Sequence, residues 1–147
     1  MTKIFHGRTI IPGDVEGEAL VTRTGFNTLA SFHLSLIRNT EVAICSDHNN
    51  RDIYGKTLTG KILCAPKTIG STSAGATWEN AAFNKITPKA VLLSDGIDSL
   101  GAAGLIMADH WANNKIITID RLGDIFLKVI NSGNILRVKR NGTVILT

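Results

Sequence analysis

Gly70-Ser71-Thr72-Ser73-Ala74-Gly75 lies between an apolar run at residues 61–65 and a helix-like segment at residues 76–85. This order predicts a strand, then a turn of small and hydroxyl-bearing residues, then a helix. The first N–H groups of a helix have no partner within it, and the positive end of its dipole lies there. The turn therefore aims several N–H groups and a serine hydroxyl at one point, which predicts a site that binds an anion or removes a proton.

The rest of the chain alternates short apolar runs with glycine-containing turns, which predicts an α/β fold with an early all-strand portion. The predicted strands are residues 8–11, 18–22, 61–65, 90–94, 115–119, 135–139 and 143–146. The predicted helices are residues 74–85, 122–131 and, shorter, 101–111. Asn141-Gly142 between the last two strands predicts a tight hairpin.

Composition favours one globular domain over residues 1–147. The chain is 44% hydrophobic and 19% charged, which is enough apolar surface for a core at this length. The net charge is only +4, and the one basic cluster, Arg137-Val138-Lys139-Arg140, alternates like a solvated strand face. Aromatic residues make up 5% of the chain, too few for base-stacking platforms. We therefore expect no nucleic-acid partner.

The two cysteines, Cys45 and Cys64, are far apart and form no Cys-x-x-Cys pair, so this chain alone predicts no metal site and no complete cysteine-ligated cluster. Lys3, His6 and Arg8 interrupt the start of the chain, and no apolar run approaches the length of a membrane span. We expect a soluble cytoplasmic protein with no membrane partner.

Residues 26–52 permit more than one interpretation. Phe26, Leu29, Phe32, Leu36 and Ile37 fit a helical stripe, while residues 41–45 fit a strand. The polar loop at residues 46–52 either holds a substrate or faces water, and water is the commoner case.

Four motifs together carry a resemblance to a known family. They are Gly17-Glu18-Ala19-Leu20-Val21-Thr22, then Tyr54-Gly55-Lys56-Thr57-Leu58-Thr59-Gly60-Lys61-Ile62-Leu63, then Gly70-Ser71-Thr72-Ser73, and finally Asp98 followed by Gly101-Ala102-Ala103. In order and spacing the chain resembles the small, swivelling subunit of the aconitase X family. The resemblance implies a swivelling β/β/α domain, with a compact barrel-like sheet and two to three helices.

The resemblance also implies a chemistry. A large catalytic subunit would supply iron or an iron–sulfur cluster, and the pair would dehydrate a hydroxylated acid: cis-3-hydroxy-L-proline as the first expectation, mevalonate 5-phosphate as the alternative. The family's general base corresponds to Ser71, and we expect Gly70, Thr72, Ser73 and Arg51 to bind substrate. A serine hydroxyl is a poor base unless its surroundings are electropositive, which the helix start favours.

Two residues of the four motifs, Ser73 and Asp98, also have simpler expected roles. Ser73 is expected to cap the helix or to donate a hydrogen bond to substrate. Asp98 follows the strand at residues 90–94, where it either orients partner or substrate or caps the Ala-rich helix, and the cap is favoured.

The chain departs from the family pattern in two places. The family's Ser-Phe-x-Gly-Gly-x-Asp segment becomes Ser31-Phe32 followed by His33, and Arg51-Asp52 replaces a His-Pro pair. Candidate replacements are His33, His48 and Arg51. A non-catalytic swivelling module therefore stays open, and a phosphohistidine carrier ranks last because no histidine lies in the Thr-Ser turn.

Overall fold

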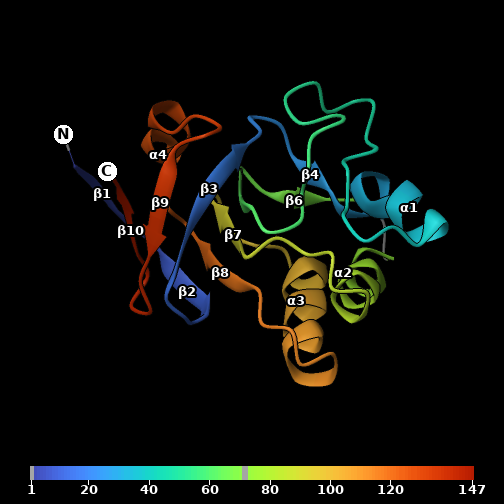
Figure 1. Ribbon diagram of the computed structural model, residues 1–147. Coiled ribbons are helices and arrows are strands. Elements are labelled where there is room, and N and C mark those ends of the chain that lie inside the picture. The colour runs from blue at the N-terminus through green and yellow to red at the C-terminus, as the bar shows by residue number, and fades with distance from the viewer. Residues whose placement is uncertain (1, 71–72) are drawn as a thin grey trace.

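The computed structural model describes residues 2–70 and 73–147 (Figure 1). Within these residues the chain forms ten strands and four helices in mixed order. The strands are β1 (Lys3–His6), β2 (Arg8–Ile11), β3 (Val15–Val21), β4 (Phe26–Asn27), β5 (Ile62–Ala65), β6 (Thr68–Ile69), β7 (Ala90–Leu93), β8 (Ile117–Asp120), β9 (Ile135–Val138) and β10 (Thr143–Leu146). The helices are α1 (Thr28–Arg38), α2 (Ala74–Phe83), α3 (Ser99–Trp111) and α4 (Asp124–Val129).

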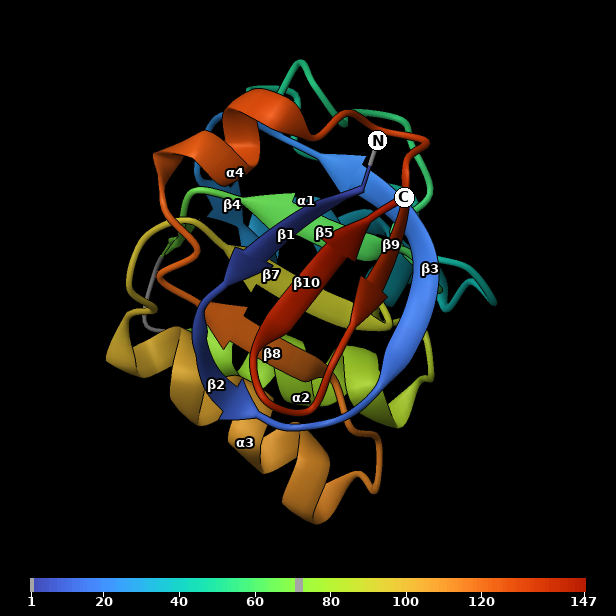
Figure 2. The ribbon, with the colours of Figure 1, turned by 90° about the vertical axis from the view of Figure 1, so that its left-hand side faces the viewer.

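Eight strands form one strongly curved sheet in the order β1-β10-β9-β3-β5-β7-β8-β2. Strands β3, β5, β7 and β8 are parallel, and antiparallel strands flank them on both sides. The two edge strands, β1 and β2, follow each other in the chain with only Gly7 between them. The sheet therefore nearly closes on itself, and Figure 2 shows β1 and β10 in front of β5, β7 and β8.

The parallel strands β5 and β7 are apolar and buried on both faces, and alternate residues enter two different hydrophobic clusters. On β5, Leu63 and Ala65 belong to an outer cluster, and Ile62 and Cys64 to an inner cluster enclosed by the sheet. The inner cluster contains Phe126 of α4, whose ring meets the Phe5 ring edge-on at 5.3 Å. This two-sided burial explains why these strands are continuous apolar runs in the sequence.

The outer cluster is covered by α1, α2 and α3 on one side of the sheet, away from the strands β1 and β10 and both chain ends (Figure 1). Its centre is three aromatic rings, Phe26, Phe32 and Trp78, whose centroids lie 5.5–6.1 Å apart. Helices α2 and α3 cross in contact at two glycines, because a Cβ on Gly104 would lie 2.7 Å from the Cα of Gly75. This close crossing sets where α2 begins.

The predicted α/β class and barrel-like sheet are confirmed, with differences in detail. The structure has four helices rather than two to three. The predicted stripe forms the helix α1 from Leu29 onward, while Phe26 lies in β4 just before it. The Asn27 side chain caps α1 and accepts from the Ala30 amide at 3.1 Å. Residues 41–45 contribute only a single bridge, Ile44 to Thr57, rather than a strand. The Asn141-Gly142 hairpin is confirmed, and Gly142 has a φ of 92°.

Across the described residues, none of the helices has the length and apolar character that crossing a membrane requires.

Candidate active site

The turn predicted to carry the chemistry joins β6 to α2. Ser71 and Thr72, the predicted base and a predicted substrate-binding residue, lie outside the described residues. The described residues on either side are Gly70 and Ser73. Gly70 has a φ of +129°, which favours glycine, and Ser73 occupies the N-cap position of α2. The Ser73 side chain makes no capping hydrogen bond to the helix, contrary to the capping role expected for it. Its carbonyl oxygen accepts from the Thr77 amide and hydroxyl, each at 3.0 Å.

The start of α1 lies against this turn. The short strands β4 and β6 pair in parallel, with Asn27 opposite Ile69. A Cβ on Gly70 would lie 3.2 Å from Oδ1 of Asn27, the same oxygen that caps α1. The N-terminus of α1 and the start of the turn are therefore in contact.

The start of α3 adjoins the turn from the other side. Asp98 caps α3, with Oδ2 accepting from the Gly101 amide at 2.8 Å, which confirms the favoured interpretation. Its other oxygen, Oδ1, accepts a short hydrogen bond from the Thr68 hydroxyl on β6. A small cavity of about 300 Å³ lies here, lined by Thr68, Ile69, Gly70, Ala74, Asp98 and Gly101. The N-termini of α1, α2 and α3 thus converge on the Gly70 turn.

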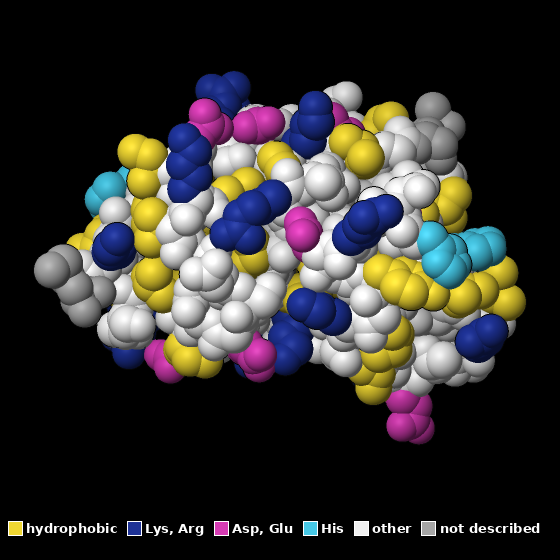
Figure 3. All heavy atoms as spheres, turned by 90° about the horizontal axis from the view of Figure 1, so that it is seen from above, with side chains coloured by type: hydrophobic (Ala, Val, Ile, Leu, Met, Phe, Trp, Pro, Cys, Tyr) yellow, Lys and Arg dark blue, Asp and Glu magenta, His cyan; other side chains and the backbone are white. Residues whose placement is uncertain are grey.

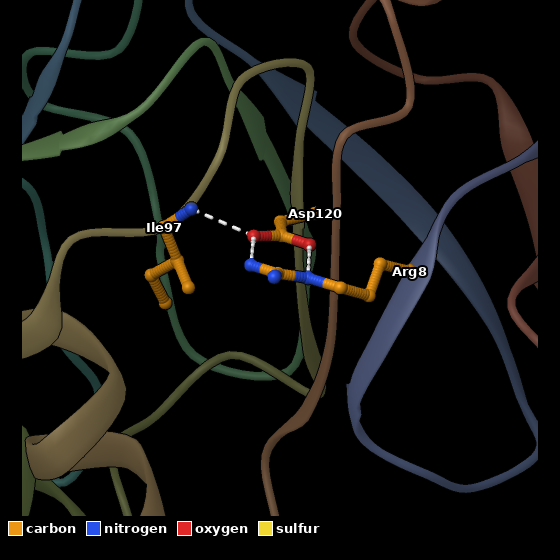
Figure 4. Close-up of polar contacts among 3 residues, drawn as sticks. All are labelled: Arg8, Ile97 and Asp120. Carbon is orange, nitrogen blue, oxygen red and sulfur yellow. Dashed lines mark hydrogen bonds and ion pairs between the residues drawn. The ribbon is translucent and has the colours of Figure 1, made fainter.

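The loop that carries Asp98 is fixed by the buried carboxylate of Asp120, which also pairs with Arg8 (Figure 4). Asp120, at the end of β8, accepts from the Ile97 amide at 2.7 Å and from Arg8 at 2.9 and 2.6 Å. Burial alone would raise the pKa of Asp120, but the hydrogen bonds from Arg8 and Ile97 and the charges of Arg8 and Arg121 outweigh it and hold that pKa below its ordinary value. The carboxylate therefore stays ionised and holds the loop.

An open groove of about 600 Å³ runs from Asn27 along the outer side of α1. It is lined by Asn27, Leu29, Ala30, His33, Leu34, Ser46, Asp47, His48 and Asn49. Two of the three predicted replacement residues, His33 and His48, therefore share one groove that begins beside Gly70. In the space-filling view a pair of histidine side chains lies next to an apolar part of the surface (Figure 3). The groove is lined by these two imidazoles and by the carboxylate of Asp47, whose Oδ1 accepts from the Asn49 amide at 3.0 Å.

The third candidate, Arg51, lies elsewhere. It is exposed on the loop and lines neither the groove nor the small cavity. The residues beside it anchor the loop to the end of β3: Oδ1 of the buried Asn50 accepts from the Thr22 hydroxyl at 2.9 Å, and Oδ2 of Asp52 accepts from the Arg23 amide at 2.7 Å. Arg51 thus lies outside the groove that His33 and His48 share.

Neither thiol is poised for reaction. Cys45 and Cys64 are buried, and burial raises the pKa of both thiols, most strongly that of Cys64. In residues 2–70 and 73–147 no cluster of three or more histidine, cysteine or acidic side chains is arranged to hold a metal ion.

Sequence reasoning missed two residues of the site, Asn27 and Thr68. An N-cap signal existed for Asn27, an asparagine directly before the first helical residue, Thr28. Thr68 carried no signal, because its role comes from a bond to Asp98, thirty positions away along the chain.

Comparisons with known proteins agree with this geometry. Residues 4–147 match the model of the aconitase X swivel domain family. The chain is 31% identical over 105 residues to the phosphomevalonate dehydratase small subunit of Thermococcus kodakarensis, covering 71% of this chain and 73% of the relative. It is 33% identical over 116 residues to the protein of the same name from Thermococcus sibiricus, covering 76% and 84%.

The fold agrees as well. The crystal structure of Thermococcus kodakaraensis aconitase X in its holo form superposes with a TM-score of 0.82 at 27% identity, covering 99% of this chain and 98% of that one. The predicted family is confirmed, as is the predicted class, the small subunit of a hydro-lyase. The relatives' names support the alternative substrate, not cis-3-hydroxy-L-proline. This chain belongs to the aconitase X swivel domain family.

Proposed function

We propose that this chain is the small subunit of an aconitase X-type dehydratase that acts on mevalonate 5-phosphate, with residues 1–147 working as one swivelling domain and Ser71 as the general base. The observation that carries the proposal is the convergence of three helix N-termini on the Gly70 turn. Ser71 follows Gly70 directly in the chain.

The helix N-termini around the turn would favour a role for Ser71 as the base. Dehydration removes a proton from the carbon α to a carboxylate and expels hydroxide from the next carbon. An alkoxide is required to take that proton, and an alkoxide is stabilised by nearby amide N–H groups and positive dipole ends. Hydrogen bonding to substrate stays a prediction for Gly70, Thr72 and Ser73.

The groove along α1 supports the phosphorylated substrate. Mevalonate 5-phosphate carries two anionic groups, and a carboxylate placed at the turn leaves the phosphate to extend into a neighbouring space. The groove begins at Asn27, beside Gly70, and offers the imidazoles of His33 and His48 as donors. We propose that these imidazoles, rather than Arg51, receive the phosphate.

The remaining chemistry belongs to a partner. We propose that a large subunit supplies iron, as a mononuclear ion or an iron–sulfur cluster, because the described residues of this chain contain no group of ligands for one. The iron would act as a Lewis acid for the departing hydroxide. This chain would contribute the base, the oxyanion environment of the turn and one wall of the substrate site.

The test is co-expression of this chain with the aconitase X large subunit of the same organism, followed by turnover assays on mevalonate 5-phosphate and cis-3-hydroxy-L-proline. We expect an iron-loaded complex that dehydrates mevalonate 5-phosphate with the higher kcat/KM. Preference for cis-3-hydroxy-L-proline would overturn the substrate and keep the enzyme class. An assembled, iron-loaded complex that turns over neither acid would favour the non-catalytic swivelling module, which the altered segment at residues 31–33 keeps open.

A further inference from the structure

We propose that Asp98 is a positioning residue, which holds the Gly70 turn at its working position through the hydroxyl of Thr68. The inference rests on the proposed function in one respect, namely that the turn carries the base. Asp98 has a second bond that its capping role does not require: one carboxylate oxygen caps α3 at the Gly101 amide, and the other accepts from Thr68 on β6.

Asp98 is itself held firmly. The preceding residue, Ile97, donates its amide to Asp120 at 2.7 Å, and Arg8 donates to both oxygens of Asp120. The Asp120 side chain is fully buried. A continuous set of bonds therefore runs from β2 and β8 through the Asp98 loop to β6.

The receiving strand is short. Among the described residues, β6 is two residues long and its ladder partner is β4, which is also two residues long. So short a ladder supplies few backbone hydrogen bonds, and a charge-assisted side-chain bond carries correspondingly more weight. Thr68 is buried and lies two positions before Gly70, so a shift of Thr68 displaces the start of the turn.

The Thr68–Asp98 bond lies close against the first turn of α3. A Cβ on Gly101 would lie 2.7 Å from the Thr68 hydroxyl and 2.8 Å from Oδ1 of Asp98. Gly70 and Ala74 face the same small cavity as this pair. The bond therefore connects the start of α3 to the strand that leads into the turn.

A positioning role predicts a particular kinetic pattern. Displacing the base slows the chemical step, whereas the groove along α1 that begins at Asn27 is formed by other residues. Removing the Thr68–Asp98 bond should therefore lower kcat and leave KM nearly unchanged.

The decisive pair of variants is Thr68→Val and Thr68→Ser in the assembled complex. Valine keeps the shape and removes the hydroxyl, and we expect kcat to fall about 10²-fold, as for a misplaced catalytic group. Serine keeps the hydroxyl and should retain most of kcat. The matched control is Thr118→Val on β8, which removes another buried threonine bond, to the Ile116 carbonyl at 2.9 Å, away from the turn. It should lower Tm and leave kcat unchanged.

A third variant separates positioning from capping. Asp98→Ser retains a side chain that caps helices well but is too short to reach Thr68 as well. We expect it to lower kcat as much as Thr68→Val does, with no further fall in the double variant, because both remove one interaction.

A second readout works without turnover. Hydrogen–deuterium exchange of the full chain, followed in peptides that span residues 68–75, should be faster in Thr68→Val than in the wild type and unchanged in Thr118→Val. Wild-type exchange in Thr68→Val, or a fall in kcat shared equally by Thr118→Val, would overturn the inference. A wild-type complex with no dehydratase activity would instead overturn the proposed function, and exchange would still decide the role of Asp98.

Discussion

Arg8 at the start of β2 and Asp120 at the end of β8 form a two-bond ion pair, with the Asp120 carboxylate fully buried and the Arg8 side chain half exposed. Because β2 is the edge strand that follows Gly7, this pair anchors one margin of the nearly closed sheet. The same carboxylate holds the Ile97 amide, so the stability of the sheet and the position of the Asp98 loop depend on one group.

Asp120→Asn is expected to lower the free energy of unfolding by about 2 kcal/mol at neutral pH, because it weakens charge-assisted bonds to a buried group. The pKa of Asp120 is lower in the folded than in the unfolded state, so its contribution to stability is complete above the unfolded pKa and is lost as pH falls through the folded pKa. Urea unfolding followed by circular dichroism, at neutral pH and across the acid range, measures both effects. We expect a shallower acid dependence in the variant. The control is Asp14→Asn, whose ion pair with Arg140 is exposed and 3.9 Å long; an equal loss in both would contradict the role given to Asp120.

Gly104→Ala should destabilise the chain by about 1–3 kcal/mol, because a Cβ there meets the backbone of Gly75 and the two helices must separate. Since α2 begins beside the turn, the assembled complex should lose activity as well. Thermal unfolding and kcat are the measurements. Gly96→Ala is a matched control, because a Cβ at Gly96 meets its nearest atom, Nε of Arg121, at an ordinary 3.5 Å. Equal stability of the two variants would argue against the close helix crossing.

Gly70→Ala tests the contact between the turn and α1. Alanine at a φ of +129° is strained, and its Cβ would press on Oδ1 of Asn27 at 3.2 Å. We expect a folded complex with kcat reduced about 10²-fold. Gly55→Ala provides the control: Gly55 also has a positive φ, 78°, but its Cβ meets no atom within 4 Å. The Tm of both variants should fall, and only Gly70→Ala should lose most of its activity.

His33→Ala and His48→Ala should raise KM for mevalonate 5-phosphate about tenfold each, since each removes one hydrogen bond to an anionic group. kcat should change little, because neither residue takes part in proton removal. Steady-state kinetics on the complex gives both constants. His6→Ala, on β1 with its ring against Thr143, is the control. An unchanged KM in both groove variants would place the phosphate elsewhere.

Much of the fold is predictable because the apolar runs of the central strands have a simple physical cause. Burial on both faces makes β5 and β7 continuous apolar runs, and such runs are visible in a single sequence. The two-residue strands β4 and β6 have no periodicity to detect, and they exist only because they pair with each other. The helical spacing of Leu29, Phe32, Leu36 and Ile37 is likewise visible in the sequence and corresponds to α1.

Part of the candidate site was also predictable, because some of its residues have local sequence signatures. Gly70 and Asp98 lie at element boundaries, where glycine and a capping carboxylate have local signatures. His33 and His48 were identified only as replacements in a family pattern, and their shared groove depends on how the loop at residues 46–49 folds against α1. The bond from Thr68 to Asp98 and the approach of Asn27 to Gly70 join residues distant in sequence, so no local pattern encodes them.

The most direct test of Ser71 as the general base is the kcat for mevalonate 5-phosphate of the Ser71→Ala and Ser73→Ala complexes. Assembly and iron content are first confirmed equal to those of the wild type. We predict that Ser71→Ala loses turnover by at least about 10³-fold, as expected when an essential base is removed, while Ser73→Ala retains most of it. Substantial turnover by the Ser71→Ala complex would contradict the claim that this turn supplies the base.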